Sequence, residues 1–581
     1  MNKRMAFGLA AALLVLSMGI TGCGGAAATV NNQPPAIPVA TVTVAPAVVK
    51  IQAGDVLKFT ATVSPAGANQ AVGWSVSGPG CMGAGCGTID ASGIYIAPVL
   101  VPSPPTVTVT ATSGADFSKS SSATVTVEPG GSTAELSGQY ALLFSGSVGA
   151  SPVAIVATFT ADGNGNLVQN SADITWANAV YTRTLEGSYT VSSDNRGTLS
   201  LDTGEAPGPE LFFNFALAVD SVSGAGLATR GRLIDITGFG ETGTGFFVKQ
   251  DPTAFSTAAM NGGYAFQLAG SQGISVNVAL GRFTASGGSL SSGLIDLGFG
   301  GNAFQSNQSF SGTYSVSGSS RGQAALNISG QPNPFGVIFY VVSSGESVWM
   351  DASGSGATGM ALQQSGAPFN TNSLNGPSVF DAAGFTVAGN DVTVGQIQFD
   401  GTGNLTDTSD ENDFGAPVSH PSSAGTYTVD PNGLGRGQLT DSCRQSTFYL
   451  VSPGTGFLIG GCDAFQAGMF ESQNGGPFNN ASFSGTYALG TLPLLYVPGS
   501  DVAGVLTADG AGNVSGTSTP LGSLTQAFTG TYSVAANGRT TMSITPNPPL
   551  PSALIFYFVS PSKAVGLQLS NSGSVVYVIE K

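Results

Sequence analysis

A four-fold repeat of alternating apolar and polar residues dominates the chain from about residue 136 onward. Residues 310–316 (FSGTYSV) and 528–534 (FTGTYSV) carry Phe, Gly, Tyr and Val at every second position, with Ser or Thr between them. Related segments occur at 185–191 (LEGSYTV) and 423–429 (SAGTYTV). A period of two is typical of a β-strand with one packed face and one solvent face. The pattern therefore predicts four copies of one all-β unit.

Each copy is the size of a domain. The tyrosines of the four segments are separated by 105 to 125 residues, which is longer than a solenoid repeat or a propeller blade. The first copy contains about eight apolar segments joined by short turns, such as 162–166 (DGNGN), and no helical crossover of the kind that parallel strands need. We therefore expect up-and-down antiparallel barrels of about eight strands, because closure removes exposed strand edges. A small open sandwich is the alternative.

The expected domain boundaries follow from these patterns. The repeats are predicted at 136–251, 254–366, 370–478 and 481–581, after an N-terminal domain at 39–128.

The N-terminal domain has short alternating segments at sandwich-like intervals. It resembles the bacterial immunoglobulin-like domain, group 2, through residues 73–76 (GWSV), 87–98 (GTIDASGIYIAP) and 123–127 (ATVTV). The resemblance implies a β-sandwich that serves as a spacer or adhesive module on cell surfaces, with Trp74 in its core.

The first residues of the chain have the form of an export signal. Lys3 and Arg4 precede an apolar stretch at 6–18 that is too short to span a bilayer, and 20–23 (ITGC) follows. This resembles the lipobox of bacterial lipoproteins, which implies a signal peptide at 1–22 and a diacylglyceryl group on Cys23. Residues 23–38 would form the lipidated cysteine and a linker. Gly24 in place of Asp favours an outer-membrane, cell-surface location in a Gram-negative bacterium; an ordinary secretory signal is the alternative.

Composition supports a folded chain and argues against a nucleic-acid partner. Only 9% of the 581 residues are charged and 41% are hydrophobic, whereas disordered chains are charge-rich and poor in apolar residues. The net charge is −16, so the chain lacks the basic patch that nucleic-acid binding requires.

The four cysteines other than Cys23 predict disulfides, because an exported chain meets an oxidising compartment. Three pairings can be drawn. Local pairing of Cys81 with Cys86 and of Cys443 with Cys462 is favoured, because the first two share a loop and the last two share a repeat. Zinc is disfavoured: there is no Cys-x-x-Cys spacing, and the single histidine of the chain is expected in a turn.

Metal and catalytic motifs are weak. Asp162, Asn164 and Asn166 offer alternating oxygen ligands, with Asp173 at the twelfth position of a calcium loop, but related turns lack some of these ligands, which favours a simple hairpin. A weak calcium site is the only cofactor considered. A second acidic group is expected in a solvated loop, with weak calcium binding as the alternative: Asp407, Asp410, Glu411 and Asp413. The single Asp-Thr-Gly triplet and the single histidine, His420, do not predict an enzyme.

One arginine per repeat follows the tyrosine strand, and the next strand is strongly apolar. The arginines are expected to make structural hydrogen bonds: Arg196, Arg321, Arg436 and Arg539. The aromatic residues of the apolar strands are expected in the core: Phe212, Phe213, Phe215, Phe339, Tyr340, Phe448, Tyr449, Phe556 and Tyr557.

These features together predict a lipid-anchored cell-surface protein with a structural or adhesive binding role. Its partners would be the membrane, through the lipid, and a glycan or surface protein. The alternative function is a carrier of small apolar ligands inside lipocalin-like barrels. The packing of the barrel interiors distinguishes the two hypotheses.

Overall fold

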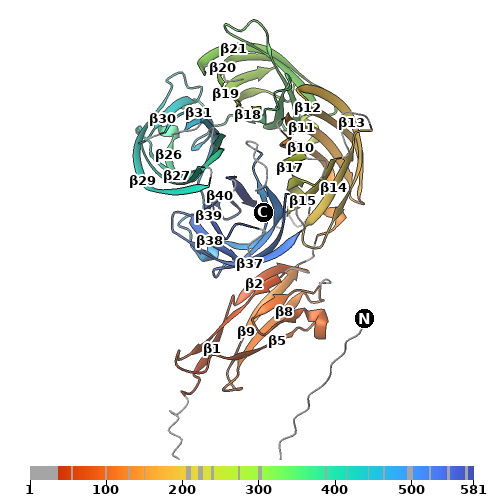
Figure 1. Ribbon diagram of the computed structural model, residues 1–581, viewed down its shortest axis with the longest axis vertical. Helices are drawn as coiled ribbons and strands as arrows, with labels where there is room; N and C mark the ends of the chain where they lie inside the picture. The colour runs from red at the N-terminus through yellow and green to blue at the C-terminus, as the bar shows by residue number, and fades with distance from the viewer. Residues whose placement is uncertain are drawn as a thin grey trace, which may run out of the picture.

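The computed structural model is all-β, with an N-terminal sandwich and four closed eight-stranded antiparallel barrels (Figure 1). It describes residues 37–581 except for 54–55, 99–100, 129–130, 150, 205–210, 220–226, 237–240, 273–274, 299–303, 386–388, 414, 443, 462–464, 494–500, 522–524, 546–549 and 570–573. Within these ranges, no helix has the length and apolar character needed to cross a bilayer. The predicted fold class is confirmed, and the open-sandwich alternative for the repeats is wrong.

Two layers of strands form the N-terminal sandwich. The strands are β1 (Thr41–Ala45), β2 (Val48–Gln52), β3 (Val56–Lys58), β4 (Thr60–Ser64), β5 (Val72–Ser77), β6 (Thr88–Ile89), β7 (Ile94–Ile96), β8 (Thr106–Ser113) and β9 (Ser120–Glu128). One layer is the sheet β2-β9-β8-β5, and the other contains β1-β4 and β3-β7-β6. Alternating residues of both layers meet in one core, against which Trp74 is partly buried beside Phe59.

Each barrel is formed by eight consecutive strands in sequence order. Barrel 1 contains β10 (Ser137–Val148), β11 (Ser151–Asp162), β12 (Asn166–Trp176), β13 (Ala179–Val191), β14 (Arg196–Asp202), β15 (Leu211–Val219), β16 (Ala228–Asp235) and β17 (Glu241–Lys249). Barrel 2 contains β18 (Gly262–Gln272), β19 (Ser275–Ser286), β20 (Ser289–Gly298), β21 (Gln305–Val316), β22 (Arg321–Ile328), β23 (Phe335–Ser343), β24 (Glu346–Asp351) and β25 (Thr358–Gln363).

Barrels 3 and 4 repeat the same order. Barrel 3 contains β26 (Asn375–Phe385), β27 (Asn390–Asp400), β28 (Asn404–Asp413), β29 (Ala416–Val429), β30 (Arg436–Thr440), β31 (Gln445–Ser452), β32 (Thr455–Gly461) and β33 (Phe465–Ser472). Barrel 4 contains β34 (Ser484–Thr491), β35 (Val502–Asp509), β36 (Asn513–Pro520), β37 (Gln526–Val534), β38 (Arg539–Thr545), β39 (Ala553–Ser560), β40 (Lys563–Gln568) and β41 (Tyr577–Glu580). Short 3-10 helices lie in the sandwich and before each barrel: η1 (Gly83–Cys86), η2 (Thr133–Glu135), η3 (Pro252–Ala254), η4 (Thr371–Ser373) and η5 (Asn480–Ser482).

The repeated tyrosine fixes the entry of each barrel. Its ring lies in the barrel core, and its hydroxyl donates to the carbonyl of a residue just before the first strand. The bonds are Tyr189 to Leu136 (2.8 Å), Tyr314 to Met260 (2.6 Å), Tyr427 to Leu374 (2.8 Å) and Tyr532 to Phe483 (2.7 Å). The glycine two residues earlier is required by close strand packing: a Cβ on Gly312 would lie 2.2 Å from the carbonyl oxygen of Ala325.

Side chains fill the barrel interiors. In barrel 1, Tyr140 stacks on Phe159, and Phe247 meets both rings edge-on, with centroids 5.5 to 5.6 Å apart. In barrel 2, Trp349 stacks between Phe266 and Phe339. Barrels 3 and 4 have equivalent buried cores. These are packed interiors of the kind that eight-stranded barrels form when side chains occupy the space.

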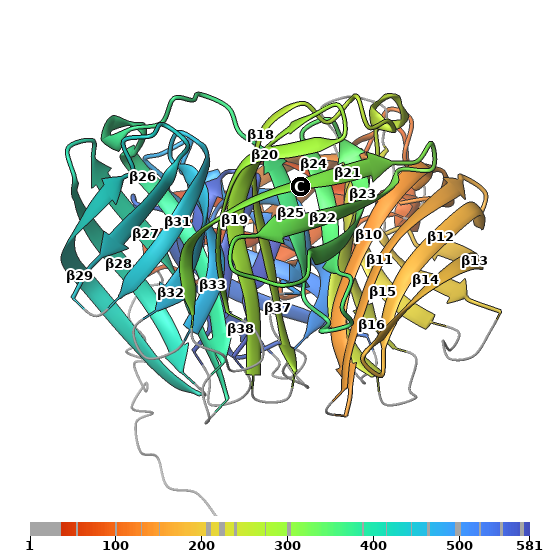
Figure 2. The same cartoon turned by 90° about the horizontal axis from the view of Figure 1, so that it is seen from above.

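The four barrels close into a ring (Figure 1). They stand side by side, as the view from above also shows (Figure 2). The first two strands of each barrel pack against the sixth and seventh strands of the next: β10 and β11 on β23 and β24, β18 and β19 on β31 and β32, β26 and β27 on β39 and β40, and finally β34 and β35 on β15 and β16. A head-to-tail contact that returns to its start forms a closed ring. The sandwich contacts barrel 4 through β2 and β3.

Candidate functional site

Three of the four barrel junctions contain the same triad of Arg, Asp and Tyr, built around a buried aspartate. The turn arginine and a tyrosine on the sixth strand of one barrel both bind an aspartate on the third strand of the preceding barrel. At the junction of barrels 2 and 3, Arg436 donates from Nε and Nη2 to the two carboxylate oxygens of Asp296, at 3.0 and 2.8 Å. The hydroxyl of Tyr449 donates to Asp296 Oδ2 at 2.6 Å.

The other two triads have the same geometry. Arg321 and Tyr340 bind Asp173, and Arg539 and Tyr557 bind Asp410, with bonds of 2.6 to 2.9 Å. All three aspartate side chains are fully buried. Burial alone would raise the pKa of Asp296, but hydrogen bonds from Arg436 and Tyr449 and the arginine charge hold it below its ordinary value. The turn arginines therefore make structural bonds, as predicted, but they make them between barrels.

The fourth junction is built differently. Its register places Ala216 beside Arg196, where the other barrels have Tyr beside Arg. Arg196 instead pairs with Asp194 of its own turn at 2.6 Å, and Thr517 of barrel 4 donates to Asp194. A buried ion pair between Arg232 of barrel 1 and Glu580 of barrel 4, at 2.7 Å, joins the two barrels. Ring closure therefore uses other polar contacts and a small cluster of alanines and valine.

A cavity of about 300 Å³ lies where the four barrels meet, and every barrel contributes to its wall. Most of the wall is apolar and includes Phe246, Met360, Phe457 and Val565. This volume is at the lower end of the range of small-molecule sites. Its charged wall residues are Arg230, Arg232, Glu346, Asp381, Glu471 and Lys563.

Each cation of the wall already has a carboxylate partner. Arg230 lies 3.5 Å from Glu346, Arg232 lies 2.7 Å from Glu580, and Lys563 lies 2.5 Å from Glu471. Arg230 and Arg232 also lie over the ring of Phe246, at 5.5 and 5.7 Å from its centroid. Each positive charge therefore has a carboxylate partner: Glu346 and Glu471 belong to the wall, whereas Glu580 lies outside it.

Asp381 is the remaining charged group. Its side chain is only 6% exposed, and no residue that the structure describes donates a hydrogen bond to it. Burial, followed by the charge of Glu471, raises the pKa of Asp381 to about 7 against the opposing charges of Lys563 and Arg232. The wall of the cavity therefore contains one buried carboxyl group that lacks a hydrogen-bond donor among the described residues.

Comparisons with known proteins give only weak similarity. No protein-family model matches the chain, and no curated protein matches it in sequence. A solved structure of a double mutant of transferrin binding protein B, a vaccine antigen from Haemophilus parasuis, is 10% identical and has a TM-score of 0.15. That comparison covers 68% of this chain and 93% of the other. No functional inference is drawn from a similarity at this level.

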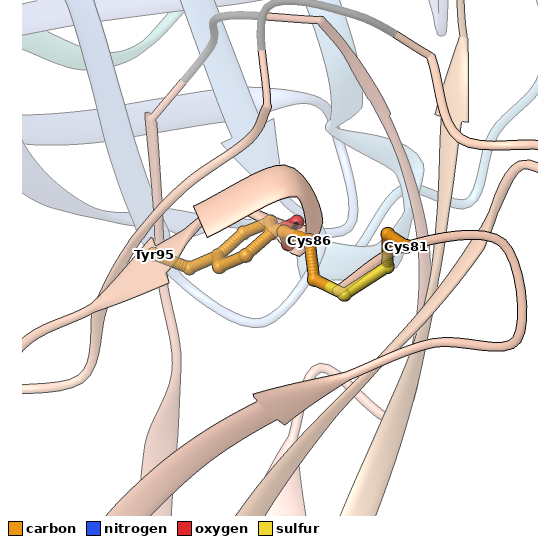
Figure 3. The surroundings of a disulfide bond; sticks show 3 residues. All are labelled: Cys81, Cys86 and Tyr95. Atoms are coloured by element: carbon orange, nitrogen blue, oxygen red, sulfur yellow. Dashed lines mark hydrogen bonds between the residues drawn. A yellow bond between two sulfur atoms is a disulfide. The ribbon is translucent and has the colours of Figure 1, made fainter. Parts of the chain in front are cut away.

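The predicted disulfides are partly within the described structure. Cys81 and Cys86 form a disulfide, with Cα atoms 5.1 Å apart (Figure 3). The hydroxyl of Tyr95 donates to the carbonyl of Cys86 at 2.8 Å, which ties this loop to β7. Cys23, Cys443 and Cys462 lie outside the described residues.

The structure does not bring the weak calcium ligands together. The carboxylate of Asp162 accepts hydrogen bonds from the backbone of Asn164 and from the backbone and side chain of Asn166, so it closes the hairpin turn. Asp173 lies seven residues along β12 from Asn166, roughly 20 Å at the rise of a strand, and binds Arg321. Among the described residues, no group of three or more His, Cys, Asp or Glu is arranged to hold a metal ion.

Three expectations about local environment are wrong. The acidic group of the third repeat belongs to β28, a barrel strand, and not to a solvated loop; Asp410 is one of the buried junction aspartates. His420 lies on β29, not in a turn, and its Nε2 is 2.9 Å from Glu411. The aromatic residues of the apolar strands do not all enter barrel cores: Phe339 faces inward, whereas Tyr340 faces the neighbouring barrel.

The sequence analysis missed Asp381. It is the fifth residue after the opening glycine of barrel 3, where the other barrels have Leu143, Gln267 and Gly490. A charged residue at this point of an otherwise apolar strand was a detectable signal once the repeats were aligned.

Proposed function

We propose that this chain is an exported, lipid-tethered binding protein of the cell surface. The sandwich, of the bacterial immunoglobulin-like type, serves as a spacer, and the ring of four barrels is the binding head. Tethering is supported by the lipobox-like residues 20–23 and the linker that follows. The head would bind a small ligand, a glycan or a surface protein.

One observation carries the binding role. The barrel interiors are filled, while buried ion pairs hold the barrels together so that their outer faces meet around a central cavity. Because side chains already occupy the interiors, carriage of an apolar ligand inside a barrel is not supported. The cavity between the barrels is the better candidate for a binding site.

Metabolic labelling with a fatty acid in the native host tests the tether. The wild-type chain should incorporate the label, and Cys23→Ala should not, because the thiol is the acceptor of the lipid. Cys86→Ala is the matched control, since it removes a cysteine elsewhere and should leave labelling intact. Equal labelling of wild type and Cys23→Ala would reject the lipid tether.

A further inference from the structure

The position of Asp381 is used for packing in the other three barrels. Leu143 is buried in the apolar cluster between barrels 1 and 2. Gln267 donates to the carbonyls of Leu458 and Gly468 of barrel 3, at 3.0 and 3.1 Å. Gly490 leaves the space that the side chain of Arg232 occupies. Each of these residues therefore joins two barrels.

Asp381 does not make such a contact. Above its pKa of about 7, Asp381 is an ionised carboxylate that only accepts hydrogen bonds, so in that state it cannot bind neighbouring carbonyls as Gln267 does. A buried carboxylate without a donor costs free energy, and apolar or amide side chains satisfy the equivalent positions. Its interactions with other barrels are electrostatic: Lys563 of barrel 4 and Arg232 of barrel 1 attract its charge, but neither donates a hydrogen bond to it.

The charges of the wall indicate which chemical group would pair with Asp381. The three cations that line the cavity are paired with Glu346, Glu580 and Glu471, which leaves the carboxylate of Asp381 in excess. The complementary group is a cation that donates hydrogen bonds. A metal ion would need several oxygen ligands, and the described residues contain no such group. Most of the surrounding wall is apolar.

We propose that the central cavity binds a small organic ammonium ion with an apolar body, whose charged group contacts Asp381. This inference rests on the proposed role of the ring as a binding head. The apolar body would lie against residues from different barrels, such as Met360 and Phe457.

Calorimetric titration of the purified full chain at pH 8 tests the inference. Three probes share one apolar body: 2-phenylethylamine, the neutral 2-phenylethanol and the anionic phenylacetate. The wild type should bind the amine at least about tenfold more tightly than the alcohol, because only the amine forms a charge-assisted hydrogen bond. Phenylacetate should not bind measurably.

Two substitutions locate the effect. Asp381→Asn should remove most of the amine's advantage and leave the alcohol unchanged, while Met360→Trp should weaken both by filling the cavity. Asp251→Asn is the matched control, because it makes the same chemical change at an exposed helix cap and should alter neither. Thermal melts establish whether each variant folds. If Asp381→Asn does not fold, the ratio of the wild type's affinities for the amine and the alcohol still tests the inference.

The outcomes separate the two proposals. Equal affinity of the wild type for amine and alcohol, or an amine advantage that survives in folded Asp381→Asn, would overturn the ammonium inference and leave a cavity that binds apolar bodies. Binding of none of the three probes would overturn both the inference and the central cavity as the binding site of the head. The fatty-acid labelling experiment tests the lipid tether, and its result does not depend on any of these binding outcomes.

Discussion

Hydrogen-bond partners decide how the buried aspartates between the barrels behave. Asp410 receives bonds from Arg539 and Tyr557, which hold its pKa below the ordinary value although burial opposes this. Asp381 is also buried but lacks a hydrogen-bond donor among the described residues, and its pKa is raised. The same residue type thus receives hydrogen bonds at a junction in one place and lacks a described donor in the wall of the cavity in another.

Removal of a junction aspartate should lower the unfolding free energy of the chain. Asp296→Asn leaves the buried Arg436 with only the more distant carboxylate of Asp430, 3.6 Å from Nη1, so we expect a loss of about 3–5 kcal/mol in unfolding free energy. The control Tyr449→Phe removes one hydrogen bond to the same carboxylate and should cost only about 1 kcal/mol. Denaturant titration of the full chain measures both. Similar losses in the two variants would show that the ion pair does not hold the junction.

Asp381→Asn should change the pH dependence of stability. Since the pKa of Asp381 is about 7 in the folded chain and about 3.9 in the unfolded chain, the folded state binds more protons between these values. Its contribution to stability therefore falls as pH rises from about 4 to 7. Relative to wild type, Asp381→Asn should be nearly unchanged at pH 4 and more stable by about 2–4 kcal/mol at pH 8.

Thermal melts at the two pH values measure this difference, with Asp202→Asn, the same change at the exposed end of β14, as control. The charged neighbours Glu471, Lys563 and Arg232 are the same in both proteins, so their titration largely cancels in the comparison. An equal shift at pH 4 and pH 8 would contradict the raised pKa.

At the scale of elements, some strands are continuously apolar and others alternate because the former are buried on both faces and the latter on one. The sixth strand of barrels 2, 3 and 4 buries both faces, one in its own core and one against the preceding barrel, as β23 does with Phe339 and Tyr340. Strands buried on both faces are nearly continuously hydrophobic. The tyrosine strands alternate because one of their faces meets solvent, as in β21.

The Cys443–Cys462 disulfide remains a prediction at this scale. Gln445 pairs with Gly461 at the open end of the β31–β32 hairpin. In the sequence, Cys443 lies just before Gln445 and Cys462 lies directly after Gly461. Closing a loop of about 20 residues should stabilise barrel 3 by about 3 kcal/mol. Peptide mapping without reduction should find the bond in protein exported by the native host.

Melts of fragment 370–478 with and without reductant should then differ by several degrees. Fragment 481–581 contains no cysteine and controls for other effects of the reductant. Two free thiols in the exported protein would reject the disulfide.

At the scale of the whole molecule, closure of the ring joins barrels that are far apart in sequence. Barrel 4 has a core of its own, but its outer face also packs on barrel 3 through Ile555, Val565 and Val578. It contacts barrel 1 through Glu580 and Thr491. Each barrel therefore has its own core, and its neighbours cover part of its outer surface.

Fragment 481–581 should fold cooperatively but associate in solution. Its eight strands close and enclose a core, so circular dichroism should show a single thermal transition. Loss of barrel 3 exposes an apolar face, which should promote self-association visible in size-exclusion chromatography. The control Val565→Thr, on that outer face, should reduce association while the transition persists. An unfolded fragment would show that the barrels share their cores.

The alternation of apolar and polar residues determined most of the local architecture. It gave the strands, their antiparallel order and the closed barrels, because a strand's side-chain period and short turns are properties of the chain alone. The repeated tyrosines and turn arginines could be recognised as structural from their recurrence.

Only the tertiary structure decided which residues from different repeats meet. The triads, the ring and the cavity depend on contacts between residues up to 348 positions apart, such as Arg232 and Glu580. An aspartate in the sequence carries no mark of its surroundings: Asp173 could be read as a calcium ligand, Asp410 as a solvated charge and Asp381 passed unnoticed. Their roles were set by which barrel packs against each strand, because burial and hydrogen-bond donors, not residue type, determine what a carboxylate does.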